Sequence, residues 1–228
     1  MIGASMDSIG DPSFRNLTPP LTAGQMQPLG PLCRRVQVST VLSESDYQTL
    51  ARFLEAYPDV TFRVYGDYDR TINDLGFLRH FPRLRRFAAD LWNLGSFEAL
   101  AYLPEDLEVL SLGATKRRLN LSPIGRFKKL RELYIEGHTK DIEVVGTLKS
   151  LEEITLRSIT LPNLELLTTL PRLWSLDLKL GGTNNLTLLP QVGRLRSLEL
   201  WLVRGLSDLR PIAEVTSLQL SFFRRCDA

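Results

Sequence analysis

Cysteine is scarce in this sequence, and long apolar runs are absent. The 228 residues include only two cysteines, Cys33 and Cys226, which are too few for a disulfide framework or a four-ligand zinc site. Charges and prolines interrupt every leucine run, so no segment reaches the roughly 18 apolar residues that a membrane-spanning helix needs. The start of the chain also lacks the basic and apolar stretches of a secretory signal. We therefore expect a cytoplasmic protein that does not enter a membrane.

The sequence also has no large excess of positive or negative residues. The formal net charge is +2, so no long-range field favours nucleic acid or an anionic membrane as a partner. The motifs GxxxxGK[ST], GxSxG, HExxH and CxxC are absent, and the two histidines and two cysteines are scattered along the chain. A nucleophile paired with a base is therefore not expected, nor is a metal or cofactor. We expect a chain that is not an enzyme.

The pattern of the chain divides it into three segments. Residues 1–31 contain five prolines and four glycines without a sustained apolar period, so we expect this segment to be irregular. Residues 32–83 are interpreted as an N-terminal cap with the first coil. Residues 84–228 carry a repeat.

The cap is predicted to be a β-α-β unit. A short apolar alternation at Val36 and Val38 precedes Ser43, a residue type that caps helix N-termini, and the helical pattern that follows ends at Pro58. Residues 59–65 then alternate like a strand.

The repeat is the pattern LxxLxL, with a second apolar set after each copy. Subtracting successive starting positions gives 23, 23, 21, 22, 22 and 20 residues. A unit of this size cannot bury its leucines alone, whereas stacked units share one continuous core. The copies start at Leu84, Leu107, Leu130, Leu151, Leu173, Leu195 and Val215.

These copies resemble the 22-residue leucine-rich repeats of the bacterial internalin class. The closest copy is GLSDLRPIAEVTSL from Gly205, which looks like the convex turn of that class. The resemblance implies an α/β fold, a solenoid with a curved parallel β-sheet and an irregular or short-helical convex side. The class usually places asparagine eight positions after the first leucine, to hold the turn. This chain has Trp92, Thr115, His138, Ile159, Gly181 and Val203 there, so its turns need other bonding groups.

The residues between the inward leucines are predicted to line the concave face. Counted from Leu84 onward, these positions hold six acids and three bases, so the face leans acidic. Tyr134 and Trp201 are aromatic anchors of the kind found in interfaces, whereas Trp92 covers a turn. His138 is expected to be solvated or bonded to a turn. The predicted partner-binding residues are Asp90, Glu132, Tyr134, Glu136, Glu153, Arg157, Asp177, Lys179, Glu199 and Trp201.

The last strand, SLQLSFF, is followed by only five residues in this sequence. We expect Phe222 and Phe223 to fold back over the edge of the sheet and keep the chain monomeric. The alternative is a dimer in which this edge strand pairs with a second copy.

Together these features predict a non-catalytic protein-binding module with a basic protein partner. The acidic, aromatic-bearing face fits a bacterial immunity protein that inhibits a basic toxin. The alternatives are an adaptor or recognition subunit of a larger assembly, and the binding domain of an effector whose catalytic part is absent.

Overall fold

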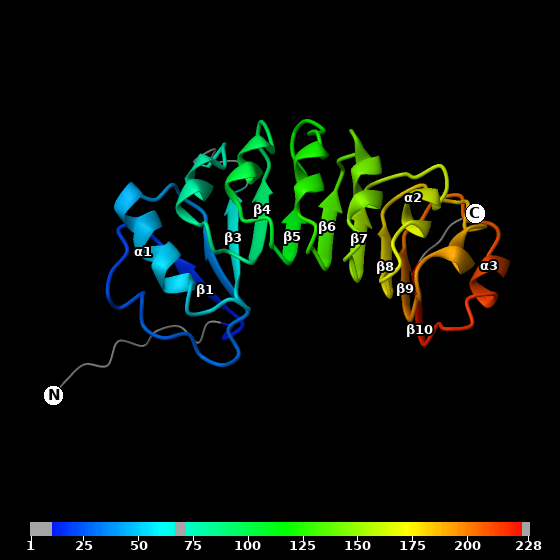
Figure 1. Cartoon of the computed structure of the whole chain (residues 1–228), viewed down its shortest axis with the longest axis horizontal. Helices are drawn as coiled ribbons and strands as arrows, with labels where there is room; N and C mark the ends of the chain where they lie inside the picture. Colours follow the sequence, from blue (N-terminus) through cyan, green and yellow to red (C-terminus); the bar gives the residue numbers. More distant parts are fainter. Residues whose placement is uncertain (1–10, 67–71, 225–228) are drawn as a thin grey trace.

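The chain forms a curved sheet in which neighbouring strands are parallel (Figure 1). The computed structural model describes residues 11–66 and 72–224, and the strands follow one another in the sheet in sequence order. Each strand and its return segment therefore make one coil of a solenoid, which confirms the predicted fold. The strands are β1 (Phe14–Leu17), β2 (Arg35–Val38), β3 (Thr61–Gly66), β4 (Arg86–Leu91), β5 (Val109–Leu112), β6 (Glu132–Glu136), β7 (Glu153–Arg157), β8 (Ser175–Lys179), β9 (Ser197–Trp201) and β10 (Leu220–Arg224).

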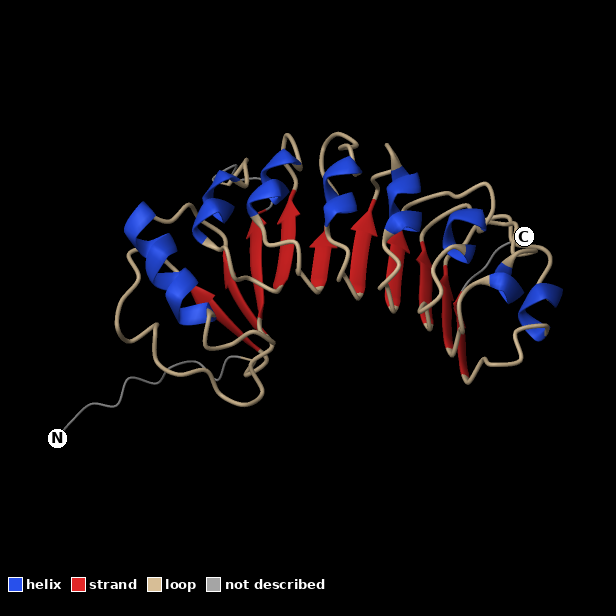
Figure 2. Ribbon diagram, in the orientation of Figure 1, coloured by secondary structure: helices blue, strands red, loops and turns tan. Residues whose placement is uncertain are grey.

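Short helices fill the return segments and lie along the outer side of the arch (Figure 2). The longest is α1 (Glu44–Leu54), while α2 (Glu165–Thr168) and α3 (Arg210–Ala213) have four residues each. Within residues 11–66 and 72–224, no helix is both long enough and apolar enough to cross a membrane. The 3₁₀ helices are η1 (Gly76–His80), η2 (Glu98–Tyr102), η3 (Ser122–Arg126), η4 (Ile142–Thr147) and η5 (Leu189–Gln191).

A spine of apolar residues runs through the solenoid in register. The pairing of β5 to β9 places the fourth residue of each repeat opposite its equivalent in the next coil. Each of these side chains is at most 2% exposed, so the coils share one core as the repeat predicts. Because side chains alternate along a strand, the residues between the core positions face outward. The spine consists of Leu110, Leu133, Ile154, Leu176 and Leu198.

The predicted β-α-β unit is present as β2, α1 and β3. Ser43 caps α1 by accepting a hydrogen bond from the backbone N–H of Asp46 at 3.1 Å. Tyr47, Leu50 and Leu54 are buried on the face of α1 that packs against the sheet.

The segment expected to be irregular contains a strand that the sequence analysis missed. Residues 14–17 form β1, which pairs in parallel with β2 and places Leu17 in the core at 2% exposure. The guanidinium of Arg15 organises the loop that follows, by donating to the carbonyls of Gln25 and Pro28 at 3.1 and 3.0 Å. These hydrogen bonds satisfy carbonyl groups of a loop in which prolines and glycines prevent regular secondary structure. Residues 1–10 lie outside the described part of the chain.

The last coil has a different register from the predicted one. A pattern that starts at Val215 would make Leu220 a core residue, but Leu220 lies opposite Ser197, an outward residue of β9. The pattern therefore starts at Leu218, whose N–H bonds to the Val215 carbonyl at 3.1 Å, as the first leucines from Leu84 to Leu173 bond to the carbonyl three residues before them. The coil is 23 residues long, from Leu195 to Leu218 (218 − 195), instead of 20.

The expected cap of Phe222 and Phe223 is wrong. Both residues belong to β10 itself, where their side chains are 51% and 44% exposed. They extend the sheet and do not fold back over it. A dimer through this edge stays the alternative prediction.

A residue with a left-handed backbone follows each of the strands β6 to β9. Its N–H donates to the carbonyl at the end of the next strand, at 2.7 to 2.9 Å, so the backbone ladder continues into the turn. Residues other than glycine rarely adopt this backbone conformation. Here the hydrogen bonds to the next strand hold them in it. The four residues are Gly137 (φ 76°), Ser158 (54°), Leu180 (55°) and Leu202 (52°).

Individual side chains take over the role of the missing turn asparagines. His138, 1% exposed, accepts the N–H of Leu119 on Nδ1 at 3.0 Å, so the ring proton lies on Nε2, 3.1 Å from the Gly113 carbonyl. The turn-bonded alternative for His138 is thereby confirmed. Burial lowers the pKa of this histidine. Two coils later in the chain, the hydroxyl of Thr183 accepts the N–H of Leu161 at 3.0 Å.

Candidate functional site on the concave face

The residues predicted to bind a partner all lie at outward positions of the sheet. They belong to strands β4 and β6 to β9, and all are half-buried among their neighbours. The sheet brings them together in three rows that cross the strands, because each strand contributes residues at the same three levels.

Ion pairs neutralise the carboxylates near the N-terminal half of this face. Arg63 on β3 donates to Asp90 at 2.5 Å and to the amide oxygen of Gln37 at 3.1 Å. Arg86 on β4 reaches across β5 to Glu132, at 3.1 Å. Arg63 was not among the predicted residues, because outward positions were counted only from Leu84 onward. The alternation of residues 59–65 was the signal that could have found it.

A chain of hydrogen bonds joins β6 to β7. The hydroxyl of Tyr134 donates to Glu136 at 2.9 Å, and Arg157 donates to the other oxygen of Glu136, also at 2.9 Å. Burial, together with the hydrogen bond to Glu136, raises the pKa of Tyr134. The phenol therefore stays protonated at neutral pH and keeps its ring fixed on the face.

Cations surround Trp201 at the C-terminal end of the face. Lys179 bridges Glu199 at 2.6 Å and Asp177 at 3.1 Å; burial opposes its charge, but these hydrogen bonds outweigh burial and raise its pKa. The ammonium of Lys179 and the guanidinium of Arg157 both lie 5.9 Å from the centre of the Trp201 ring. Such cation–π contacts fix the indole in place.

Counted over the ten described strands, the outward positions hold equal numbers of acids and bases. The predicted acidic excess is therefore wrong for the face as a whole. The residues counted for that prediction did not include Arg35 and Arg63, which precede the repeat. They also did not include Arg224, which the shifted register of β10 places beside Trp201. The six acids are Asp90, Glu132, Glu136, Glu153, Asp177 and Glu199, and the six bases are Arg35, Arg63, Arg86, Arg157, Lys179 and Arg224.

The centre of the face nevertheless keeps an uncompensated negative charge. Glu132, Glu153 and Asp177 line a shallow hollow of about 160 Å³ together with Tyr134 and Thr155. Among the outward carboxylates of the described strands, Glu153 alone has neither an ion pair nor a side-chain hydrogen bond. Burial, followed by the charges of Glu132 and Asp177, raises the pKa of Glu153. The hollow is thus arranged to accept a positively charged group.

The other candidate positions do not form a second site here. Trp92 lies at a turn and is 42% exposed, outside the concave rows. Within residues 11–66 and 72–224, no group of three His, Cys, Asp or Glu side chains could hold a metal ion. Cys33 is buried and unpaired, and Cys226 lies outside the described residues.

Three solved structures share this architecture. An internalin (inlF) from Listeria monocytogenes matches with a TM-score of 0.56 and 18% identity, over 83% of this chain and 54% of that one. An internalin C2 (inlC2) from the same organism matches with a TM-score of 0.52 and 14% identity, over 79% and 84%. TLR13, in its complex with ssRNA13, matches with a TM-score of 0.59 and 17% identity, over 91% and 34%. The chain thus spans about half of the first internalin and a third of TLR13.

No protein-family model matches the sequence, and no curated protein sequence matches it either. Identities below one fifth to the solved structures establish the fold alone. The architecture of the chain, from its spine to its turns, is that of a leucine-rich-repeat solenoid.

Proposed function

We propose that this chain is a non-catalytic protein-binding module whose partner docks on the concave face. The observation that carries the proposal is the central hollow, where Glu153 is half-buried and has no counter-ion. A carboxylate in this state is stabilised when a partner supplies the missing cation, because a charge-assisted hydrogen bond replaces the lost water. Tyr134 lines the hollow and Trp201 lies on the same face towards its C-terminal end; both are aromatic residues of the kind that anchor interfaces.

The chemistry of the partner follows from the hollow more than from the whole face. A lysine or arginine side chain fits a space lined by Glu132, Glu153 and Asp177. Around it, the balanced ion pairs favour a partner with charges of both signs. The partner is therefore proposed to be a protein that presents a basic residue at its centre of contact. A cytoplasmic location stays a prediction.

Catalysis is not part of the proposal. The carboxylates of the hollow lie on an open sheet that water can reach. Both ring nitrogens of His138 are engaged in hydrogen bonds within a turn. General acid–base work needs groups that converge on a reacting atom with matched proton affinities. The hollow offers three acids, which suits the binding of a cation better than proton transfer.

A more specific form of the proposal is a bacterial immunity protein that inhibits a basic toxin. It is supported by the negative hollow and by the fold shared with two internalins of a bacterium. An inhibitor of this kind would hold a basic segment of the toxin in the hollow.

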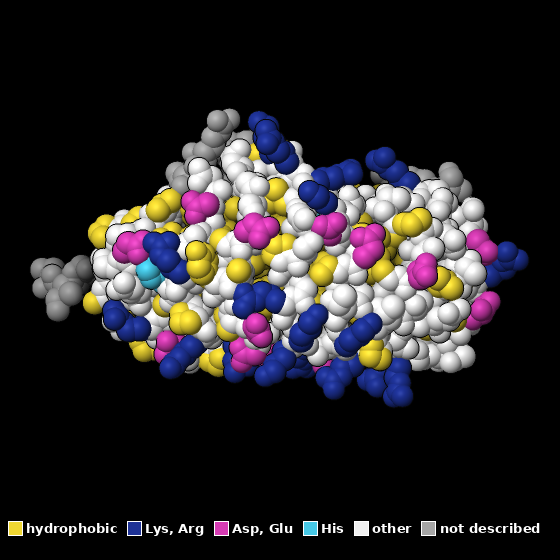
Figure 3. Space-filling view, turned by 45° about the horizontal axis from the view of Figure 1, so that its top comes forward, with side chains coloured by type: hydrophobic (Ala, Val, Ile, Leu, Met, Phe, Trp, Pro, Cys, Tyr) yellow, Lys and Arg dark blue, Asp and Glu magenta, His cyan; other side chains and the backbone are white. Residues whose placement is uncertain are grey.

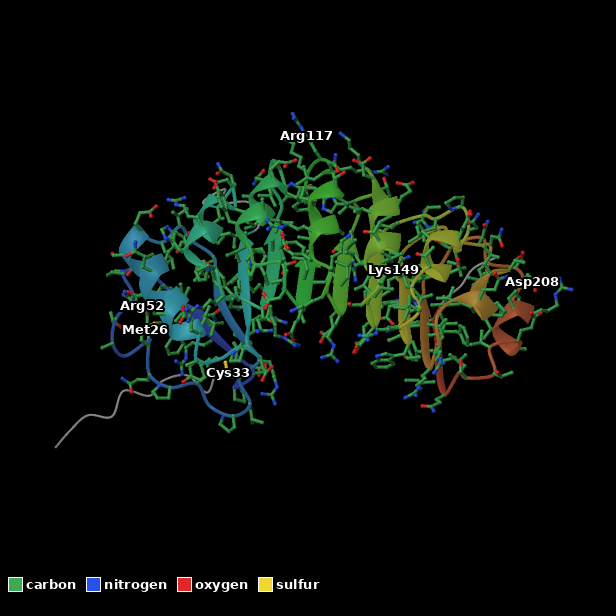
Figure 4. The ribbon with its side chains drawn as sticks, viewed as in Figure 1. Met26, Cys33, Arg52, Arg117, Lys149 and Asp208 are labelled. Carbon is green, nitrogen blue, oxygen red and sulfur yellow. The ribbon has the colours of Figure 1, made fainter. Side chains whose placement is uncertain are left out.

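The test is affinity capture from the native host with a concave triple variant and a convex control. Wild type and the convex control Arg117→Glu should capture the same protein, whereas the triple variant E132K/E153K/D177K should lose it. Arg117 projects from the outer side of the arch, far from the hollow (Figure 4). Loss of capture by the convex variant, with unchanged capture by the triple variant, would contradict the proposal. Circular dichroism of each variant checks that the solenoid still folds.

An adaptor in a larger assembly is the alternative, and the N-terminal segment would be its second contact. Deletion of residues 1–31 would remove β1 from the sheet, so removal of residues 1–10 is the cleaner test. An inhibitor should keep its affinity after this deletion, whereas an adaptor should lose one of two partners. An effector fragment would instead be recognised by a longer native reading frame.

A further inference from the structure

A second hollow lies at the edge of the sheet where β8, β9 and β10 begin. Its volume is about 880 Å³, which is several times larger than that of the concave hollow. Its lining includes three arginines, one tryptophan, one leucine and a single carboxylate: Arg172, Arg194, Arg196, Trp174, Leu220 and Glu152. Lysine and arginine side chains also gather along the lower margin of the molecule in Figure 3.

The arginines of this hollow have no ion-pair partner among the described residues. Elsewhere along the same edge, arginine alternates with glutamate: Arg85 pairs with Glu108 at 2.6 Å and Arg131 with Glu152 at 2.8 Å. Backbone hydrogen bonds link these residues from coil to coil, so each faces its equivalent in the next coil. After Glu152 the alternation stops, and the next two coils contribute Trp174 and Arg196 to the row.

Apolar surface lies beside these charges. Trp174 is 37% exposed and Leu220 is 63% exposed, although both belong to residue types that are usually buried. An exposed indole beside free guanidiniums combines a flat apolar contact with donors that match carboxylates in pairs. Arg172, Arg194 and Arg196 are all exposed, so no rearrangement of the coil is needed for them to reach a ligand.

We propose that this edge groove binds a short acidic segment of a partner protein. Aspartate or glutamate side chains of the segment bond to Arg172, Arg194 and Arg196, and an apolar side chain rests on Trp174. The groove is separate from the hollow around Glu153, so the two surfaces select ligands of opposite charge. The solenoid can then hold a basic and an acidic element at the same time.

An extended polyanion fits the groove less well. The row continues from Trp174 to Glu152 and then, past Arg131, to Glu108, so carboxylates bound the positive surface on one side. A phosphate backbone needs a continuous positive track over several nucleotides and usually more than one stacking ring. A short peptide needs only the length of the last three coils.

The experiment is fluorescence anisotropy with three labelled probes. The first is a short peptide of Asp, Glu and Leu, the second is its counterpart of Asn, Gln and Leu, and the third is a short oligothymidylate. The acidic peptide should bind wild type and lose affinity as salt rises, because exposed charges are screened. The variant R172E/R194E/R196E should weaken its binding about tenfold or more, and Trp174→Ala should weaken it about threefold or more.

The matched control is K116E/R117E/R118E, which makes the same change in net charge on an exposed turn of the convex side. It should leave the affinity for the acidic peptide within about twofold of wild type. Equal losses in both triple variants would show attraction by net charge and overturn the proposal. Tighter, arginine-dependent binding of the oligothymidylate than of the peptide would also overturn it, in favour of a nucleic-acid site. Binding of the amide peptide as tight as that of the acidic one would do the same, in favour of an apolar site.

Discussion

At the residue scale, the turns show how the chain dispenses with the asparagines of its class. His138 supplies an acceptor to Leu119 and a donor to Gly113, the two functions of a turn amide. The sequence identified the position as a departure and left two alternatives for the histidine. Both bonding partners, Gly113 and Leu119, lie in the preceding coil. Only the folded structure could therefore show whether this histidine is solvated or bonded to a turn.

His138 can be tested by exchange for alanine and for asparagine. Alanine leaves the N–H of Leu119 and the carbonyl of Gly113 buried without partners, which should lower the free energy of unfolding by about 2–4 kcal/mol. Asparagine restores an acceptor and a donor, so its loss should be smaller. Urea unfolding followed by circular dichroism measures both. An alanine variant as stable as the asparagine variant would contradict this role.

Glu153 should show the opposite behaviour, because its charge is unfavourable in the free protein. Its pKa is raised, so the folded state holds this proton more tightly than the unfolded state, and stability is lost as pH rises through the folded pKa. Glu153→Gln removes that loss and should raise the melting temperature at pH 7. The difference from wild type should vanish near pH 4, where the wild-type residue is protonated. A variant less stable than wild type at pH 7 would show that Glu153 has a stabilising partner.

At the element scale, the leucine period was sufficient to predict the strands β4 to β9, the spine and the outward rows of these strands. Ser43 and the apolar face of the following helix predicted α1 in the same way. Prediction failed where two patterns overlapped. In the last coil both Val215 and Leu218 could begin the repeat. The hydrogen-bonded register of β10 against β9 shows that the repeat begins at Leu218. The strand β1 was not predicted because its own sequence pattern is too short to indicate a strand. It is stabilised by parallel pairing with β2, which lies outside the repeat.

The shared core predicts a large cost for shortening a spine residue. Leu176 is fully buried between Ile154 and Leu198, so Leu176→Ala should lower the free energy of unfolding by about 2–5 kcal/mol through the cavity it leaves. Its neighbour Ser175 faces outward, and Ser175→Ala should change stability by less than about 0.5 kcal/mol. Guanidinium unfolding of both variants makes the comparison. Equal effects would mean that the coils do not share this spine.

The register of the last coil has its own test in two leucines. Leu218 occupies the first position of the repeat and is half-buried, whereas Leu220 is 63% exposed on the edge strand. Leu218→Ala should therefore cost about 1 kcal/mol or more, and Leu220→Ala less than about 0.5 kcal/mol. Thermal unfolding ranks the two variants. A cost of about 1 kcal/mol or more for Leu220→Ala as well would support the register that starts at Val215, in which both leucines are core positions.

At the scale of the whole molecule, the solenoid distributes charge into local patterns that composition conceals. The face that looked acidic from the repeat alone is balanced by Arg35, Arg63 and Arg224. The central hollow keeps a negative charge without an ion pair at Glu153, and the edge groove keeps positive charges without ion pairs around Trp174. The rows could be predicted from the repeat, but the pairing across strands could not, because it depends on which side chains reach one another over the curved sheet.

The most direct measurement of the central claim is the dissociation constant of the purified partner for two single variants. Glu153→Gln removes the uncompensated charge from the hollow, and Arg117→Gln removes one charge from the convex turn. The concave variant should bind about tenfold more weakly, a loss of about 1.4 kcal/mol, while the convex variant binds like wild type. Unchanged binding by Glu153→Gln together with weakened binding by Arg117→Gln would contradict docking on the concave face.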